Sequence, residues 1–124
     1  MLADILNVNP MTSPTACSLD RDVALARAGG DLELLREIAG LFLANYGIWV
    51  GEIREAVAQS DAPGLERSAH GLKGSVANFG ADAAVEAAFR LEQSGRRRDL
   101  SEVAQVLNTL ELALAALRPE LESL

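Results

Sequence analysis

The sequence is poor in the residues that most catalytic and metal centres require. Its 124 residues include one cysteine, Cys17, and one histidine, His70. A single cysteine cannot close a disulfide within the chain, which is consistent with a reducing compartment. One cysteine and one histidine cannot build an ordinary structural zinc site, and no glycine-rich phosphate loop follows a predicted strand. We therefore expect the chain to bind no metal and no cofactor.

Aromatic residues are also scarce. They make up 4% of the chain, against a hydrophobic content of 49%, so the core must be built from Leu, Ala, Val and Ile. Such a core suits close-packed helices better than a sheet sandwich. A chain of this length holds one hydrophobic core and has no room for a second domain. These features predict an all-α fold in a single domain.

Basic residues and long apolar runs are both in short supply. Eleven Lys and Arg stand against 18 Asp and Glu, for a formal charge of -7, which would repel the phosphate backbone of nucleic acid. The uncharged, mainly apolar run from Ile38 to Gly51 is shorter than the ~20 residues of a bilayer span. Met1 to Val8 contains Asp4 and lacks the basic flank of a secretory signal. We expect no nucleic-acid partner, no membrane anchor and a cytoplasmic location.

Turn-forming residues mark the start of the folded domain. They are dense in residues 9–15, which predicts a flexible N-terminal arm over residues 1–18 and a folded domain over residues 19–124. Asp20 can then cap a short first helix that ends at Ala28.

Apolar residues recur every three or four positions through the rest of the chain. Gly80 and Gly95 are placed to end the second and third of these segments, and Asp99 with Glu102 forms a capping box at the start of the last. Pro119 is expected to end or bend that last helix. With short loops between them, the long helices predict an antiparallel up-and-down four-helix bundle, with the short N-terminal helix as a lid. The expected long helices cover residues 32–59, 63–79, 81–94 and 100–117.

His70 is predicted on the water-facing side of its helix. At about 100° of rotation per residue, His70 lies about 140° from the centre of the apolar stripe. Lys73 and Gly74 flank it, so the imidazole shares a small open patch with one cation and a residue without a side chain. An isolated surface histidine usually has no function, so the neighbours carry the argument. The stripe consists of Leu65, Ala69, Leu72, Val76 and Phe79.

The pattern His70-x-Leu72-Lys73-Gly74-Ser75, followed by Gly80-Ala81, resembles the histidine-containing phosphotransfer (HPt) domains of bacterial and fungal multistep phosphorelays. The resemblance extends over roughly 100 residues, from about Leu19 to Leu117, which is far more specific than a short motif. Further matching positions are Leu19-Asp20, Gly29-Gly30-Asp31, Leu34-Leu35, Phe42-Leu43, Asp61 and Leu91-Glu92.

This resemblance implies a phosphocarrier rather than an autonomous enzyme. His70 Nε2 would accept a phosphoryl group from an aspartyl phosphate on a response-regulator receiver domain and pass it to the aspartate of another receiver. The metal ion that assists the transfer, Mg²⁺, would belong to the receiver. A hybrid histidine kinase is a further candidate partner, and a monomer is expected. The resemblance leaves open the particular receivers, the direction of net flow, the regulated process, and whether the chain is a module of a larger kinase.

Four residues are assigned supporting roles. Lys73 could offer its ammonium to the phosphoryl oxygens, and Gly74 leaves room for a phosphodonor to dock closely. By resemblance, Glu92 should accept a hydrogen bond from Nδ1 of His70, which leaves the lone pair on Nε2 facing outward. Arg96 either assists Lys73 near the phosphate, again by resemblance, or belongs to a solvated loop after Gly95.

Other functions fit the sequence less well. A helical adaptor, in which His70 is incidental and the glycine-bearing patch docks a partner, is the main alternative. A Ser-His-carboxylate triad or another acid-base enzyme would need a shaped pocket beside His70, which a small bundle offers poorly. The dimerising histidine helix of kinases is a rival source of an exposed histidine, but the Lys-Gly-Ser sequel and the chain length favour a monomeric bundle.

Overall fold

The computed structural model describes residues 18–124, where the chain forms five helices and no strand. The predicted arm therefore lies outside the described residues, apart from Ser18. The helices are α2 (Arg21–Arg27), α3 (Leu32–Ala58), α4 (Ala62–Ala77), α5 (Asp82–Arg97) and α6 (Val103–Glu122).

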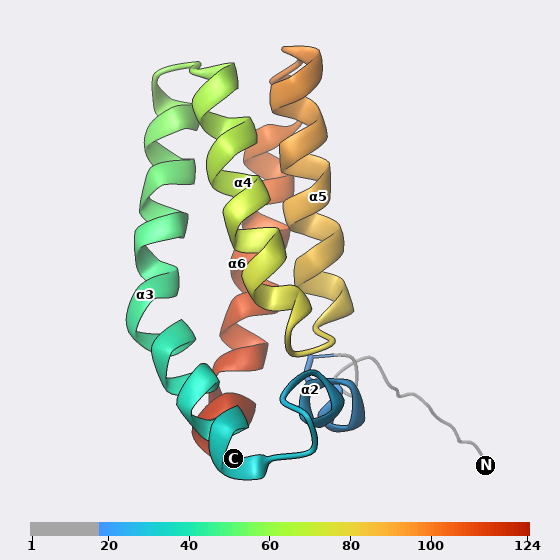
Figure 1. Cartoon of the computed structure of the whole chain (residues 1–124). Helices are drawn as coiled ribbons and strands as arrows, with labels where there is room; N and C mark the ends of the chain where they lie inside the picture. Colours follow the sequence, from blue (N-terminus) through green and yellow to red (C-terminus); the bar gives the residue numbers. More distant parts are fainter. Residues whose placement is uncertain (1–17) are drawn as a thin grey trace, which may run out of the picture.

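The four long helices form an antiparallel bundle (Figure 1). Helices α3, α4, α5 and α6 run alternately up and down, and α2 lies crosswise beneath one end of α4 and α5. The predicted all-α bundle with a short additional helix is confirmed. No helix among the described residues is long and apolar enough to cross a membrane.

Three of the helices begin at an aspartate, because its carboxylate can accept hydrogen bonds from the backbone N–H groups of the first turn, which have no partner within the helix. Asp20 accepts from Val23 N at 3.1 Å, and Asp61 accepts from Gly64 N at 3.0 Å. Asp31 accepts from the N–H groups of two residues at the start of α3. The N-cap predicted at Asp20 is confirmed.

Helix α5 does not stop at Gly95, contrary to the sequence prediction. It continues to Arg97, and Arg98 ends it in the left-handed conformation with φ 57°. Gly95 instead lies against the backbone of α4, where a Cβ atom would come within 2.7 Å of the carbonyl oxygen of Ala62. The glycine is present because two helices approach closely there.

The start and end of α6 also differ from the prediction. Asp99 accepts from the N–H and hydroxyl of Ser101 and so stabilises a turn, and the helix begins later, at Val103. Pro119 lies inside α6, which continues to Glu122. A proline this close to the C-terminus removes only one backbone hydrogen bond, and Leu121, 3% exposed, holds the last turn in the core.

The core lies along the bundle axis and is made mainly of Leu, Ala and Val. The stripe predicted on the histidine helix is fully buried, with each member no more than 1% exposed. One of its members, Phe79, packs edge-on against Phe42 of α3, with ring centroids 5.3 Å apart. Helix α4 is thus fixed along one side, which leaves its opposite side free to carry functional groups.

Candidate functional site

His70 projects from the middle of α4 into solvent. Its side chain is 68% exposed, on the face opposite the buried stripe. The predicted orientation of the ring is therefore confirmed. An exposed imidazole is able to meet a reacting group on another protein.

A buried carboxylate on α5 supports the ring from behind. Glu92 is only 3% exposed, and its Oε2 lies 2.9 Å from Nδ1 of His70. The same carboxylate forms an ion pair with Lys73, with Nζ 2.6 Å from Oε1, and lies 3.5 Å from Nη2 of Arg96. Because a buried charge is costly unless it is paired, this cluster of cations explains how Glu92 can lie there.

The ionisation state of Glu92 decides which ring nitrogen of His70 carries the proton. Burial raises the pKa of the Glu92 carboxyl, but the contacts with Lys73 and His70 outweigh it and hold the pKa below its usual value of 4.5. The group is then an ionised carboxylate at neutral pH, which can only accept hydrogen bonds. Nδ1 of His70 must donate to it, so in the neutral ring the lone pair is on Nε2.

Lys73 lies beside the histidine but is turned toward Glu92. Its side chain is 26% exposed, and Nζ sits over the ring of Phe89, 5.2 Å from the centroid. The ammonium is thus held by a carboxylate and an aromatic face. Its predicted contact with phosphoryl oxygens stays a prediction.

Arg96 belongs to the last turns of α5 and not to a loop. Its Nε lies 3.0 Å from Oε2 of Glu66 on α4. Together with His70 and Arg67, these residues line a hollow of about 440 Å³ between α4 and α5. The alternative of a solvated loop is wrong, because the helix runs through Gly95. The role of Arg96 near a phosphate stays a prediction.

The two glycines that follow His70 differ in their surroundings. A Cβ atom on Gly74 would meet nothing within 4 Å, so the surface there is open, as expected. A Cβ atom on Gly71 would lie 2.6 Å from the ring of Trp49 on α3. Ser75 donates to the carbonyl of Gly71 at 3.2 Å, a contact within the helix itself.

The sequence reasoning missed Glu66, Phe89 and Trp49. Glu66 lies four residues before His70 and therefore on the same side of α4, a spacing that could have signalled it. Phe89 likewise precedes Glu92 by three residues on α5. Trp49 gave no such signal, because its contact with Gly71 joins two helices. No cluster of three or more metal-ligating side chains occurs in the described part of the chain.

The family model for the Hpt domain matches residues 37–120, which is more than half of the chain. Two solved structures share the fold. Histidine-containing phosphotransfer protein B from Pseudomonas aeruginosa PAO1 has a TM-score of 0.79 and 23% identity, over 86% of this chain and 92% of that one. The HPT domain of the Hpt sensor hybrid histidine kinase from Shewanella has a TM-score of 0.71 and 23% identity, over 87% of this chain and 97% of that one.

Among curated proteins, no sequence matches the chain. The family match rests on the region that contains His70, Lys73, Gly74 and Glu92. The chain belongs to the Hpt domain family, the phosphotransfer modules of two-component signalling.

Proposed function

We propose that this chain is a phosphorelay intermediate in which His70 carries the phosphoryl group. The observation that carries the proposal is the geometry of the ring, which is 68% exposed and bound through Nδ1 to a carboxylate that is 3% exposed. A nucleophile held in one tautomer and one orientation needs less rearrangement to reach its phosphodonor.

The transfer is a displacement at phosphorus. Nε2 of His70 attacks the phosphoryl group of an aspartyl phosphate on a receiver domain. The N–P bond forms as the P–O bond to the aspartate breaks, and the aspartate leaves as a carboxylate. Nδ1 keeps its proton, and Glu92 stabilises the positive charge that develops on the ring. In the reverse direction the same groups deliver the phosphoryl group to the aspartate of another receiver.

The partner supplies the remaining groups in this proposal. Mg²⁺ is held by the receiver, where it neutralises charge on the transferring group. This chain contributes the nucleophile, Lys73 and Arg96 as nearby cations, and the open surface at Gly74. It acts as a monomer and has no turnover of its own. The hollow beside His70 is lined mainly by charged residues, which suits a phosphoryl group better than an apolar substrate.

The proposal is tested by incubating the chain with phosphorylated receiver domains of the source organism. Wild type should gain one phosphoryl group from at least one receiver, as measured by intact mass, whereas His70→Gln should gain none. A small donor, phosphoramidate, should label wild type in the absence of any receiver. Equal labelling of wild type and His70→Gln would reject the proposal.

An adaptor without phosphotransfer is the second candidate, favoured by the exposed apolar side chains of α3. Leu41 is 66% exposed and Ile48 is 60% exposed, on a face that none of the described residues covers. The adaptor predicts that His70→Gln leaves partner binding and signalling unchanged, while a bulky residue in place of Gly74 abolishes binding.

A further inference from the structure

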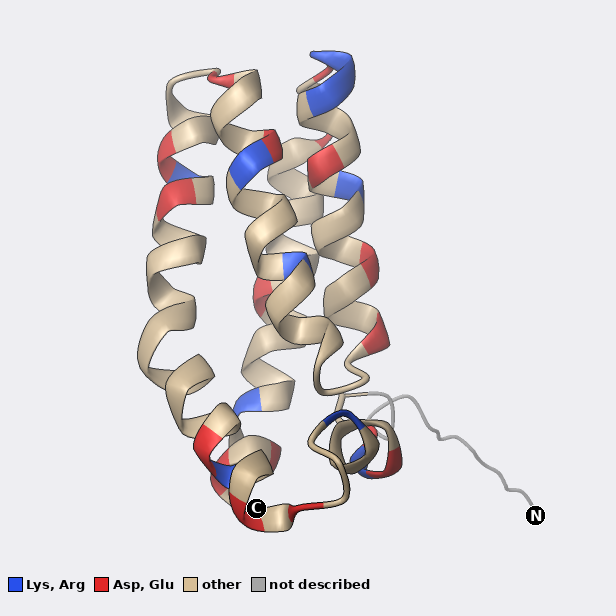
Figure 2. Cartoon of the chain, viewed as in Figure 1, with Lys and Arg blue, Asp and Glu red and all other residues tan. Residues whose placement is uncertain are grey.

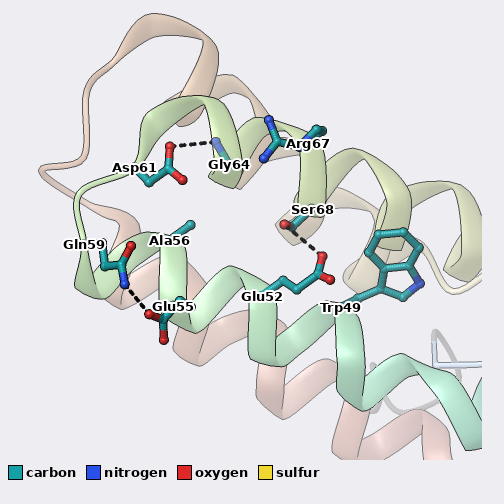
Figure 3. Close-up of a pocket in the computed structure, with 9 residues that line it drawn as sticks. All are labelled: Trp49, Glu52, Glu55, Ala56, Gln59, Asp61, Gly64, Arg67 and Ser68. Atoms are coloured by element: carbon teal, nitrogen blue, oxygen red, sulfur yellow. Dashed lines mark hydrogen bonds between the residues drawn. The ribbon is translucent and has the colours of Figure 1, made fainter.

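A second hollow lies on the other side of α4, between its first half and the second half of α3. It has a volume of about 500 Å³ (Figure 3). Trp49 closes one end of it, and Asp61 lies at the other. We call it the α3–α4 groove. It is separate from the hollow beside His70, although Arg67 lines both.

The α3–α4 groove carries uncompensated negative charge. Glu52, Glu55 and Asp61 line it, with Arg67 as its one cation. Within residues 18–124, these three carboxylates have only neutral partners: Glu52 accepts from Ser68 Oγ at 3.4 Å, Glu55 from the Gln59 amide, and Asp61 from Gly64 N. Neutral donors orient the carboxylates but cancel none of their charge, so the groove favours a cation.

One wall of the groove is an indole. The ring of Trp49 occupies the space that a side chain at position 71 would need, since a Cβ on Gly71 would lie 2.6 Å from it. Ser68, 6% exposed, lines the floor and donates to Glu52. An aromatic face next to carboxylates is a typical environment for a guanidinium or ammonium group, through cation–π attraction and charge-assisted hydrogen bonds.

Two glycines lie on the surface of α4 between His70 and the groove. At about 100° per residue, Gly74, Arg67 and Gly71 lie about 40°, 60° and 100° around α4 from His70, all in the same direction. Two of these three positions are glycines, and the third contributes to the groove. A protein that covers His70 and Gly74 would therefore continue over Gly71 and reach Trp49.

We propose that the α3–α4 groove receives a basic side chain of the receiver domain in the same encounter that brings the aspartyl phosphate to His70. This inference rests on the proposed function, which supplies the receiver. The basic side chain stacks on Trp49 and pairs with Glu52 and Glu55. Charge pairing at the edge of an interface mainly selects the partner and speeds association, so the groove is a specificity determinant and not part of the chemistry.

The test uses the receiver that transfers fastest to wild type in the screen described above. Glu52→Lys should raise the KM for that phosphorylated receiver, the concentration that gives half the maximal single-turnover rate of transfer, roughly tenfold. It should leave that maximal rate little changed, since it replaces attraction with repulsion away from the reacting atoms. Labelling of His70 by phosphoramidate should stay at the wild-type rate. This second readout separates the two proposals, because failure of the phosphocarrier function would abolish labelling by both donors.

A matched control is available on the same helix. Glu37→Lys makes the same charge change 15 residues earlier on α3, about 22 Å from Glu52 at 1.5 Å per residue, and should leave KM unchanged. A charge swap identifies the basic residue of the receiver. When each surface Lys or Arg of the receiver is changed to Glu in turn, one of these receiver variants should restore a low KM with Glu52→Lys. An unchanged KM for both Glu52→Lys and Glu55→Lys, or an equal rise for Glu37→Lys, would overturn the inference.

Discussion

The two sides of the histidine helix are built differently. Toward α5, the backbones approach closely at Gly95, and a buried carboxylate joins residues of both helices. Toward α3, helix α4 is bordered by two hollows of about 500 and 250 Å³, against one of about 440 Å³ toward α5. Trp49 lines both of the hollows toward α3. The close side fixes the orientation of His70, and the open side leaves room for another protein.

The distribution of charge supports the same division. Helix α3 carries its charged residues toward its two ends and none between Ile38 and Gly51 (Figure 2). On the α4–α5 side, Arg96 is paired with Glu66, and Glu92 is paired with Lys73 and Arg96. A paired surface attracts a charged partner weakly, whereas an apolar surface bordered by unpaired carboxylates can select one.

The largest expected effect is a loss of stability at the close contact. Gly95→Ala places a methyl group 2.7 Å from two backbone atoms of α4, the carbonyl oxygen of Ala62 and the nitrogen of Glu66. Backbone atoms cannot move aside as the end of a flexible side chain can. We expect the free energy of unfolding to fall by roughly 2 kcal/mol, as measured by urea denaturation. Gly51→Ala is the control, since its methyl group meets nothing within 4 Å and should stabilise α3 by up to about 1 kcal/mol. Equal effects of the two changes would show that the helices do not touch at Gly95.

Gly95 also shows what the sequence can and cannot predict. The helix N-cap at Asp20 and the exposure of His70 follow from residues close in the chain, and both were predicted. Gly95 was assigned to a helix end, because its true neighbour lies 33 residues earlier, at Ala62. The contact between Trp49 and Gly71 is likewise tertiary. The position of Glu92 behind His70 came from the resemblance to a family, which already contains such tertiary information.

The next effect concerns the orientation of the nucleophile. Glu92→Gln keeps the shape of the side chain but removes the charge that fixes the tautomer of His70. We expect the rate of phosphotransfer from the receiver to fall roughly tenfold, the size of effect typical of groups that orient a histidine. Rapid-quench measurement of the labelled protein would show it. A wild-type rate would mean that the close side of α4 has no part in transfer.

The acid dependence of stability offers a smaller test of the same carboxylate. The pKa of Glu92 is lower in the folded chain than its usual value of 4.5, so ionisation of this group stabilises the fold above that pH. The contribution is lost as the pH falls through the lowered pKa. The difference in unfolding free energy between wild type and Glu92→Gln should therefore shrink between pH 6 and pH 3. The other carboxylates are shared by both proteins and cancel. A constant difference would contradict the assigned ion pairs.

The smallest effect compares Gly74 and Gly71, which lie one helical turn apart on α4. Gly74→Ala should stabilise the chain by about 0.5 to 1 kcal/mol, because alanine is the better helix former and the methyl group meets open space. Gly71→Ala should gain almost nothing, since the indole of Trp49 must move to admit the methyl group. Trp49 is the only tryptophan in the chain, so its fluorescence reports that movement directly. We expect a changed emission maximum for Gly71→Ala and an unchanged one for Gly74→Ala. If Gly71→Ala were as stabilising as Gly74→Ala and left the emission unaltered, Trp49 would not lie against α4, and the open side of the histidine helix would lack its aromatic wall.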